Sequence, residues 1–158
     1  MSRIFSPKPI LKVYRCLAAL SLCFFALVSN AQESVNLSKL IDKGMLPISK
    51  QTAYLKDSSN SMSLKDVISR LPIMTQVKED VINFGFVNES YWFTSLIKND
   101  LEKSQRFFLE IDYPLLDSIE FYILNPETNG IIFNYHTGDS LPFKNRLIDQ
   151  ASFVFPIE

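Results

Sequence analysis

Ser118-Ile-Glu-Phe-Tyr-Ile-Leu124, followed by Asn125-Pro-Glu-Thr-Asn-Gly130 and Ile131-Ile-Phe-Asn-Tyr135, is the stretch of sequence that decides the fold. Its first segment has apolar residues at every second position, which is the side-chain period of a β-strand with one buried face. Its middle segment ends in Asn-Gly, a strong signal for a hairpin turn. The stretch therefore predicts two antiparallel strands joined by a tight turn.

Strand-like runs recur along the chain on both sides of this hairpin, at residues 51–55, 82–86, 91–98, 106–112 and 152–156. They are rich in aromatic and β-branched residues, and turn-forming residues lie between them. No regular alternation of strands and helices is present. The pattern predicts a mainly β protein, an antiparallel β-sandwich.

One short helix is predicted over residues 63–70, where it would cover part of a sheet. Ser63 can cap its N-terminus, and Asp66 stands three residues later, as in a capping box with Asp in place of Glu. An apolar face follows at helical spacing, and Pro72 ends the helix. The face consists of Leu64, Val67, Ile68 and Leu71.

The N-terminus has the order of a secretory signal. A basic region is followed by the uncharged run 16–28 and then by Ser29-Asn-Ala31, with small residues where signal peptidase cuts. A membrane anchor is the alternative, but a spanning helix needs about 20 apolar residues and this run is shorter. We therefore predict that residues 1–31 are a cleaved signal peptide and that the remainder is exported.

The exported part divides into a leader segment, residues 32–48, and a sandwich, residues 49–158. Leu37, Leu40 and Ile41 allow one short helix in the leader segment, ended by Gly44. The chain stops inside or just after an apolar strand. We therefore expect a piece of a longer protein, with the last strands of the sandwich missing and an edge left unpaired.

Charge and cysteine content exclude several classes of function. Residues 1–31 carry four basic residues and no acid, so the remainder has 16 − 4 = 12 basic and 17 acidic residues, a formal charge of −5. Such a domain has no electrostatic reason to bind nucleic acid. Cys16 and Cys23 both lie in the signal peptide, so the mature part can form neither a disulfide nor a cysteine-based zinc site.

No recognisable catalytic pattern is present. His136 is the single histidine, no nucleophile elbow accompanies it, and a strand-end polar residue is the simpler interpretation. The chain has no glycine-rich phosphate loop, and its paired acids lie where solvated strand ends are expected. We predict no enzyme activity and no cofactor, although Asp112, Asp117 and Asp139 leave a weak Ca²⁺ site open.

Several aromatic residues could stack on a sugar ring or enclose a small ligand, because such rings offer an apolar face and a polar tip. These are Tyr91, Trp92, Tyr113 and Tyr122. The alternative is that they belong to the core and its edges. We favour the core for Trp92 and leave both interpretations open for Tyr113 and Tyr122.

A series of motifs, each weak alone, occurs in one order over about residues 50–158. They are Asn83-Phe-Gly-Phe-Val-Asn-Glu-Ser-Tyr-Trp-Phe93, Ile97-Lys-Asn99, Leu109-Glu-Ile-Asp-Tyr-Pro-Leu-Leu-Asp117, Phe121-Tyr122, Thr137-Gly-Asp139, Leu141-Pro-Phe143 and Phe153-Val-Phe-Pro156. In this order they resemble the type 2 extracellular domain of bacterial seven-transmembrane receptors with diverse intracellular signalling modules (7TMR-DISM).

The resemblance implies a jelly-roll sandwich similar to carbohydrate-binding modules, on the periplasmic side of the inner membrane. Seven membrane-spanning helices and a cytoplasmic output module, such as a diguanylate cyclase or a histidine kinase, would follow the domain. These parts are absent from this chain, so the output class stays open.

The leading hypothesis is therefore a periplasmic sensor domain of a membrane receptor. It would bind a small ligand, carbohydrate included, and reach the membrane through the missing helices; a homodimer is left open. The alternatives are an exported carbohydrate-binding module of a secreted enzyme and, less favoured, a periplasmic hydrolase. The candidate ligand-binding residues, expected to line one concave surface, are Tyr113, Asp117, Tyr122 and Asp139. Pro114 and Gly138 are expected to set turns, and Asp139 could instead cap a loop.

Overall fold

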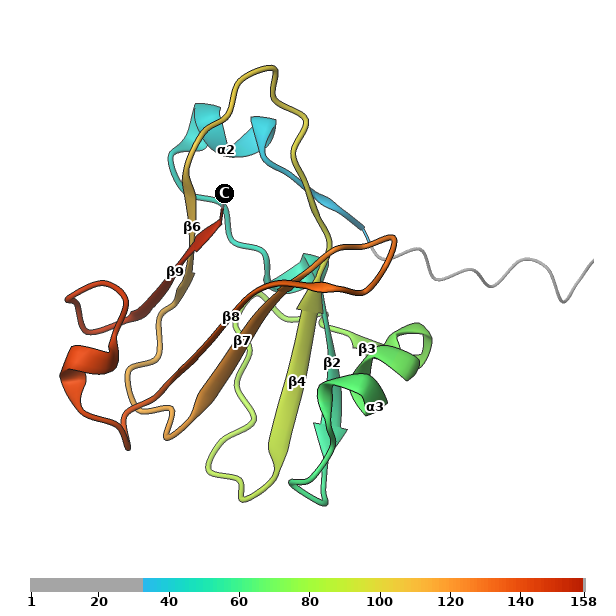
Figure 1. Cartoon of the computed structure of the whole chain (residues 1–158), viewed down its shortest axis with the longest axis vertical. Helices are drawn as coiled ribbons and strands as arrows, with labels where there is room; N and C mark the ends of the chain where they lie inside the picture. Colours follow the sequence, from blue (N-terminus) through green and yellow to red (C-terminus); the bar gives the residue numbers. More distant parts are fainter. Residues whose placement is uncertain (1–32, 158) are drawn as a thin grey trace, which may run out of the picture.

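The computed structural model describes residues 33–157 (Figure 1). The predicted signal peptide, residues 1–31, lies outside the described residues. The described chain consists mostly of strands, and its helices are short. The helices are α2 (Ser38–Lys43), α3 (Leu64–Ser69) and the 3₁₀ turns Ser49–Gln51, Leu71–Ile73 and Phe143–Asn145.

The strands are β1 (Val35–Asn36), β2 (Thr52–Asp57), β3 (Thr75–Gln76), β4 (Ser90–Ser95), β5 (Ile97–Lys98), β6 (Phe107–Ile111), β7 (Ile119–Leu124), β8 (Ile131–Thr137) and β9 (Phe153–Ile157). Three antiparallel groups form, in the orders β3-β2-β4, β6-β9 and β7-β8. One short pair, β1 with β5, is parallel. A mainly β, antiparallel, sandwich-like fold is confirmed.

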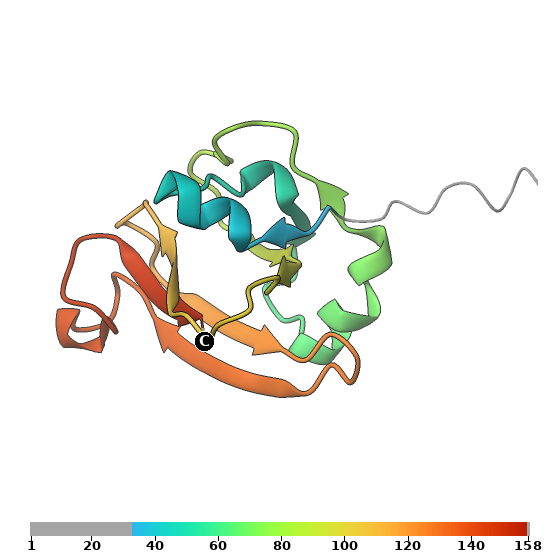
Figure 2. The same cartoon turned by 90° about the horizontal axis from the view of Figure 1, so that it is seen from above.

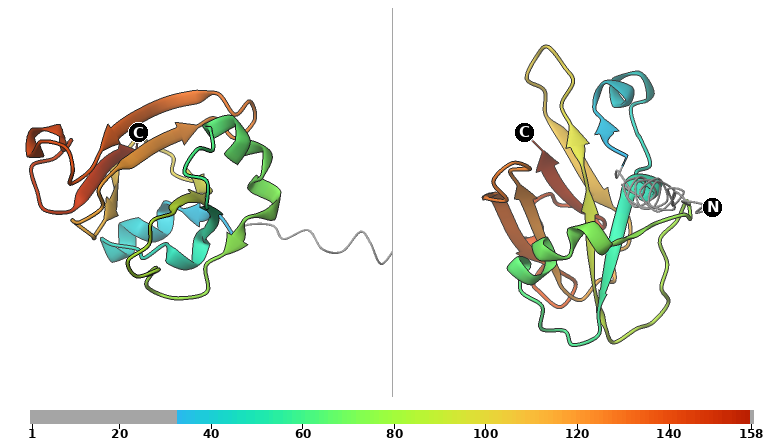
Figure 3. Two further views of the ribbon diagram at one scale, coloured as in Figure 1. Left: turned by 90° about the horizontal axis from the view of Figure 1, so that it is seen from below. Right: turned by 90° about the vertical axis from the view of Figure 1, so that its right-hand side faces the viewer.

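The groups lie in layers. Seen from above, β7 and β8 form a curved band along one side, with α2 and β1 across from it (Figure 2). The right-hand view of Figure 3 shows the β7–β8 hairpin on one side of β2 and β4, and the segment of residues 77–89 on the other. The β7–β8 hairpin is the one that the sequence predicts, and its turn holds Asn129 at a φ of 56°.

Strand β9 supplies the centre of the core. Phe153 and Phe155 are each 1% exposed. The ring of Phe155 stacks on Phe121 of β7, with 4.2 Å between the centroids. Since β9 is paired in register with β6, Leu109 opposite Phe155, this stack fastens the β6–β9 pair to the β7–β8 hairpin.

Helix α3 begins as predicted. The Asp66 amide donates to the Ser63 hydroxyl, and the Asp66 carboxylate accepts from the Ser63 amide at 2.9 Å, which completes the capping box. Val67 is the residue of this helix that is buried. The short helix predicted in the leader segment is also present as α2, and Gly44 ends it with a φ of 70°.

The strand expected at residues 82–86 is wrong. The described segment between β3 and β4 contains no strand, because the Asn83 side chain accepts a 2.8 Å hydrogen bond from the Gly85 amide and Gly85 turns the chain at a φ of 69°. The Phe84 side chain is nevertheless packed, because its ring stacks on that of Tyr91 in β4 with 4.2 Å between the centroids. The single strand expected at residues 91–98 is likewise divided into β4 and β5 at Leu96.

Candidate functional site

The predicted residues Asp117 and Asp139 come together where two turns meet. The Asp139 amide donates a 2.7 Å hydrogen bond to the carbonyl oxygen of Leu116. The Ser140 amide and hydroxyl both donate to the Asp117 carbonyl, at 3.1 and 2.6 Å. The turn before β7 is thus tied to the turn after β8.

Gly138 makes this close approach achievable. It is buried, its φ is +152°, and a Cβ atom built on it would overlap the Asp117 carbonyl group. Glycine is therefore required in the Thr-Gly-Asp motif by backbone packing. The expectation that Gly138 sets a turn is confirmed.

Arg146 secures the same region, and sequence reasoning missed it. Its side chain is 7% exposed and lies 3.5 Å from the carboxylate of Asp139. Its guanidinium donates to the carbonyls of Pro114 and Gln150, each at 3.4 Å, and to that of Ala151. A cation with this many acceptors holds several turns in one arrangement.

Two phenylalanine rings flank the same guanidinium. Its central carbon lies 4.1 Å from the ring centroid of Phe153 and 5.1 Å from that of Phe143, both within the range of cation–π contacts. We call Asp117, Asp139, Ser140 and Arg146 the turn cluster. Its backbone and side-chain contacts join the turn before β7 to the turn after β8, which is a structural role.

Tyr113 lies in the same connection between β6 and β7. The residue is 48% exposed. It therefore presents an aromatic surface to solvent near the turn cluster.

Tyr122, the remaining predicted residue, lies in the middle of β7, away from the two turns. Its hydroxyl donates a 2.7 Å hydrogen bond to Oε2 of Glu120, and this bond raises the pKa of Tyr122 above its ordinary value. Its strand partner on β8 is Asn134, and that of Glu120 is His136. Directly paired residues of an antiparallel ladder point to the same face, so these side chains share one surface.

Solvent reaches this surface, since Glu120, Asn134 and His136 are exposed while Phe133 and Tyr135 on the opposite face of β8 are half-buried. His136 stands near the end of β8, as expected. Its Nε2 lies 3.0 Å from the hydroxyl oxygen of Ser118, which also is exposed.

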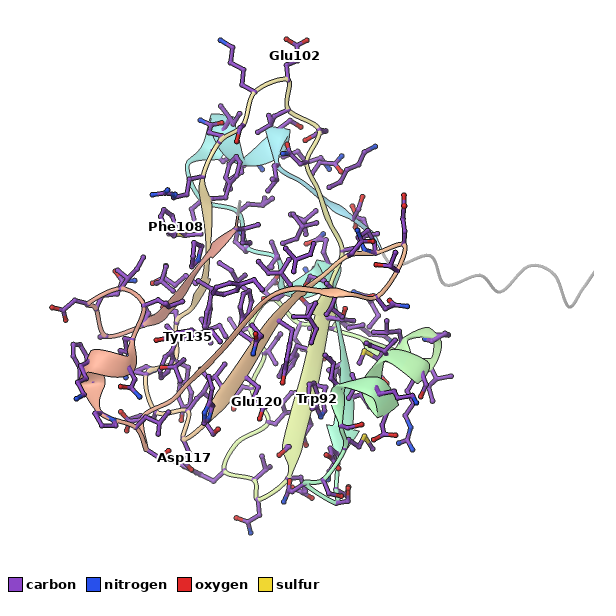
Figure 4. All side chains as sticks on the ribbon, in the orientation of Figure 1. Trp92, Glu102, Phe108, Asp117, Glu120 and Tyr135 are labelled. Carbon is purple, nitrogen blue, oxygen red and sulfur yellow. The ribbon has the colours of Figure 1, made fainter. Side chains whose placement is uncertain are left out.

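Trp92 adds an aromatic ring from β4. It is half-buried and stacks on Tyr122 with 6.3 Å between centroids and 25° between the ring planes. Figure 4 shows Trp92 and Glu120 at a similar height, with Asp117 below them at the foot of β7. We call this surface the Trp92–Tyr122 face; its members are Trp92, Ser118, Glu120, Tyr122, Asn134 and His136.

This face can bind a small polar ligand. Aromatic rings stack on the apolar side of a sugar-like ring, and a carboxylate, an amide, an imidazole and a hydroxyl beside them supply donors and acceptors. Strand β7 begins next to the turn cluster and carries Glu120 and Tyr122 of the face, but Tyr122 is apart from the turns that hold Asp117 and Asp139. A role in ligand binding stays a prediction for all the residues proposed from sequence.

Within residues 33–157 no three His, Cys, Asp or Glu side chains come close enough together to hold a metal ion. Nor is any helix in that part of the chain long and apolar enough to cross a membrane.

The family model described as 7TMR-DISM extracellular 2 matches residues 49–158. No curated protein matches the chain.

Proposed function

We propose that this chain, which belongs to the 7TMR-DISM extracellular 2 family, is the periplasmic ligand-sensing domain of a bacterial membrane signalling receptor. It would bind a small ligand, a carbohydrate in our proposal, and pass the signal to a cytoplasmic output module. The match over residues 49–158 is the observation that carries this proposal.

The family consists of extracellular sensor domains of membrane receptors, so the domain is exported. Membership favours a receptor over a module attached to a secreted enzyme. The order of charges and apolar residues in the first 31 residues supports export by a cleaved signal peptide, with release at Ala31.

The Trp92–Tyr122 face is the surface on which we propose that the ligand binds. Its stacked rings and its exposed polar groups match what a carbohydrate needs. Binding alone changes no output, since a ligand shifts a receptor only if it binds one state more tightly than another. We propose that strand β7 transmits the effect of binding from the face to the turn cluster, because it carries Glu120 and Tyr122 and begins next to that cluster.

Export is tested first. The full chain with its own N-terminus is produced in a bacterium, and the N-terminal residue of the periplasmic form is determined. We expect the mature form to begin at Gln32. Replacing Ala31 with Arg should block processing, because the cut site needs a small residue. Protein recovered from the cytosol with Met1 attached would contradict the proposal.

Ligand binding is tested on the exported protein with a panel of monosaccharides and oligosaccharides. A ligand at 100 times its Kd should add about 2.7 kcal/mol to the free energy of unfolding and raise Tm accordingly. Trp92 is the single tryptophan of the sequence, so its emission reports directly on this face. A panel that moves neither Tm nor emission would contradict the carbohydrate assignment.

A further inference from the structure

The charge of the Trp92–Tyr122 face restricts which ligands it can bind. Glu120 carries a formal negative charge there, and neither lysine nor arginine is among the members of the face. Residues 32–158 as a whole have a formal charge of −5. The potential at this surface therefore favours positive or neutral ligands over anions.

The aromatic pair adds to this preference. The faces of Trp and Tyr rings attract cations through the ring quadrupole, and the indole ring does so most strongly. Here the two rings lie 6.3 Å apart next to a carboxylate. A sugar ring carrying a protonated amine could stack on one ring and place its positive charge near the other and near Glu120.

The carboxylate is held in place for such a contact. The Tyr122 hydroxyl donates to Oε2 of Glu120 at 2.7 Å. Because a carboxylate can accept at both oxygens, Glu120 keeps capacity for a second donor. The same bond raises the pKa of Tyr122, in keeping with a phenol that stays protonated beside an anion.

We infer that the Trp92–Tyr122 face selects a cationic ring ligand, an amino sugar, with Glu120 as the charge-selecting residue. This inference rests on the proposed function and specifies the class of its ligand. An anionic sugar is rejected by the same carboxylate, and a neutral sugar gains the stacking without the charge contact.

The test uses three sugars that share one ring and differ in charge: D-glucosamine, D-glucose and D-glucuronate. The exported full chain is titrated with each sugar while Trp92 emission is recorded, at low and at high salt. We expect glucosamine to bind about 3- to 10-fold more tightly than glucose, and glucuronate most weakly. The advantage of glucosamine should shrink in high salt, because exposed charge contacts are screened.

Glu120→Gln should abolish the advantage of glucosamine and leave the affinity for glucose within about 2-fold. Glu127→Gln is the matched control: it removes one charge from the turn of the same hairpin, outside the face, and should keep the ranking of the three sugars. Tyr122→Phe releases Glu120 without removing its charge and provides a second variant should Glu120→Gln fold poorly. It should reduce the advantage of glucosamine in part.

Equal affinity for glucosamine and glucuronate, an unchanged ranking in Glu120→Gln, or no response of Trp92 to any of the three sugars would each overturn the inference. The proposed function is judged separately, by export and by stabilisation with the wider panel. A chain that is exported and stabilised by a neutral or anionic sugar would keep its function as a sensor and lose the amino-sugar assignment.

Discussion

Gly138 lies so close to Asp117 that the backbone of residues 117–118 occupies the space where a side chain at position 138 would begin. Replacing Gly138 with Ala should therefore force the two turns apart and weaken the Asp139–Leu116 and Ser140–Asp117 hydrogen bonds. We expect the free energy of unfolding to fall by about 3 kcal/mol or more, measured by urea denaturation.

Gly44→Ala is the control for this substitution. Gly44 also has a positive φ, but nothing lies within 4 Å of a Cβ built there. Replacing it should lower the free energy of unfolding by only about 1 kcal/mol, the cost of a side chain at a positive φ. Equal losses in the two variants would show that the close contact with Asp117 has no energetic weight.

Arg146→Lys should destabilise the protein although it keeps the charge. An ammonium group cannot reproduce the planar fork that reaches Pro114, Gln150 and Ala151, nor the contact of the guanidinium with the Phe153 ring. We expect a loss of about 2 kcal/mol in urea denaturation. Lys144→Ala, at an exposed position nearby, should stay within about 0.5 kcal/mol of the parent. If Arg146→Lys unfolds with the same free energy as the parent, Arg146 does not hold the turns together.

Asp57 should make stability depend on pH in the acid range. The Ser59 hydroxyl donates a 2.6 Å bond to its carboxylate, and the amides of Met62 and Ser59 donate as well, so that the pKa of Asp57 lies below its ordinary value. A pKa lowered by folding stabilises the protein above the unfolded pKa of about 3.9, and this stability is lost as pH falls through the folded pKa.

Asp57→Asn should accordingly have a lower Tm than the parent at pH 7, and the difference should narrow as the pH is taken below about 4. Differential scanning calorimetry at several pH values measures this. Asp149→Asn, which removes one exposed charge, is the control. A difference that stays constant with pH would show that Asp57 does not act through its charge.

Ser63→Ala should remove the capping box of α3, because the Asp66 amide loses its acceptor. The expected cost is about 1 kcal/mol in the free energy of unfolding. Ser63→Thr retains an acceptor and should therefore keep most of the free energy of unfolding that Ser63→Ala loses. If Ala and Thr behave alike, the hydroxyl of residue 63 has no part in holding the helix.

Where a signal is local, the sequence predicts the structure well. The capping box at Ser63, the hairpin of β7 and β8, and the helix ending at Gly44 each depend on residues a few positions apart. The segment 82–86 shows the opposite case. Its alternation of apolar and polar residues predicts a strand, but Asn83 and Gly85 form a turn. Phe84 packs on Tyr91 without its segment joining a sheet.

The candidate site was only partly predictable for the same reason. Asp117 and Asp139 stand in recognisable motifs, and they do meet. Arg146 reaches Pro114 across 32 residues and leaves no pattern in the sequence. The pairing of Trp92 with Tyr122 joins strands that share no hydrogen-bonded ladder in the described part of the chain, so only coordinates could reveal it.

The parallel pair of β1 and β5 has a consequence for the timing of folding. Immediately after β1, Ser38 bonds to the carboxylate of Asp100, which lies 62 residues later in the chain. Translation proceeds at about 5–20 residues per second, so Ser38 waits roughly 3–12 s for Asp100 to be synthesised. Throughout that interval the amides of Val35 and Leu37 are without their acceptors, the carbonyls of Leu96 and Lys98, although both residues are buried in the finished fold.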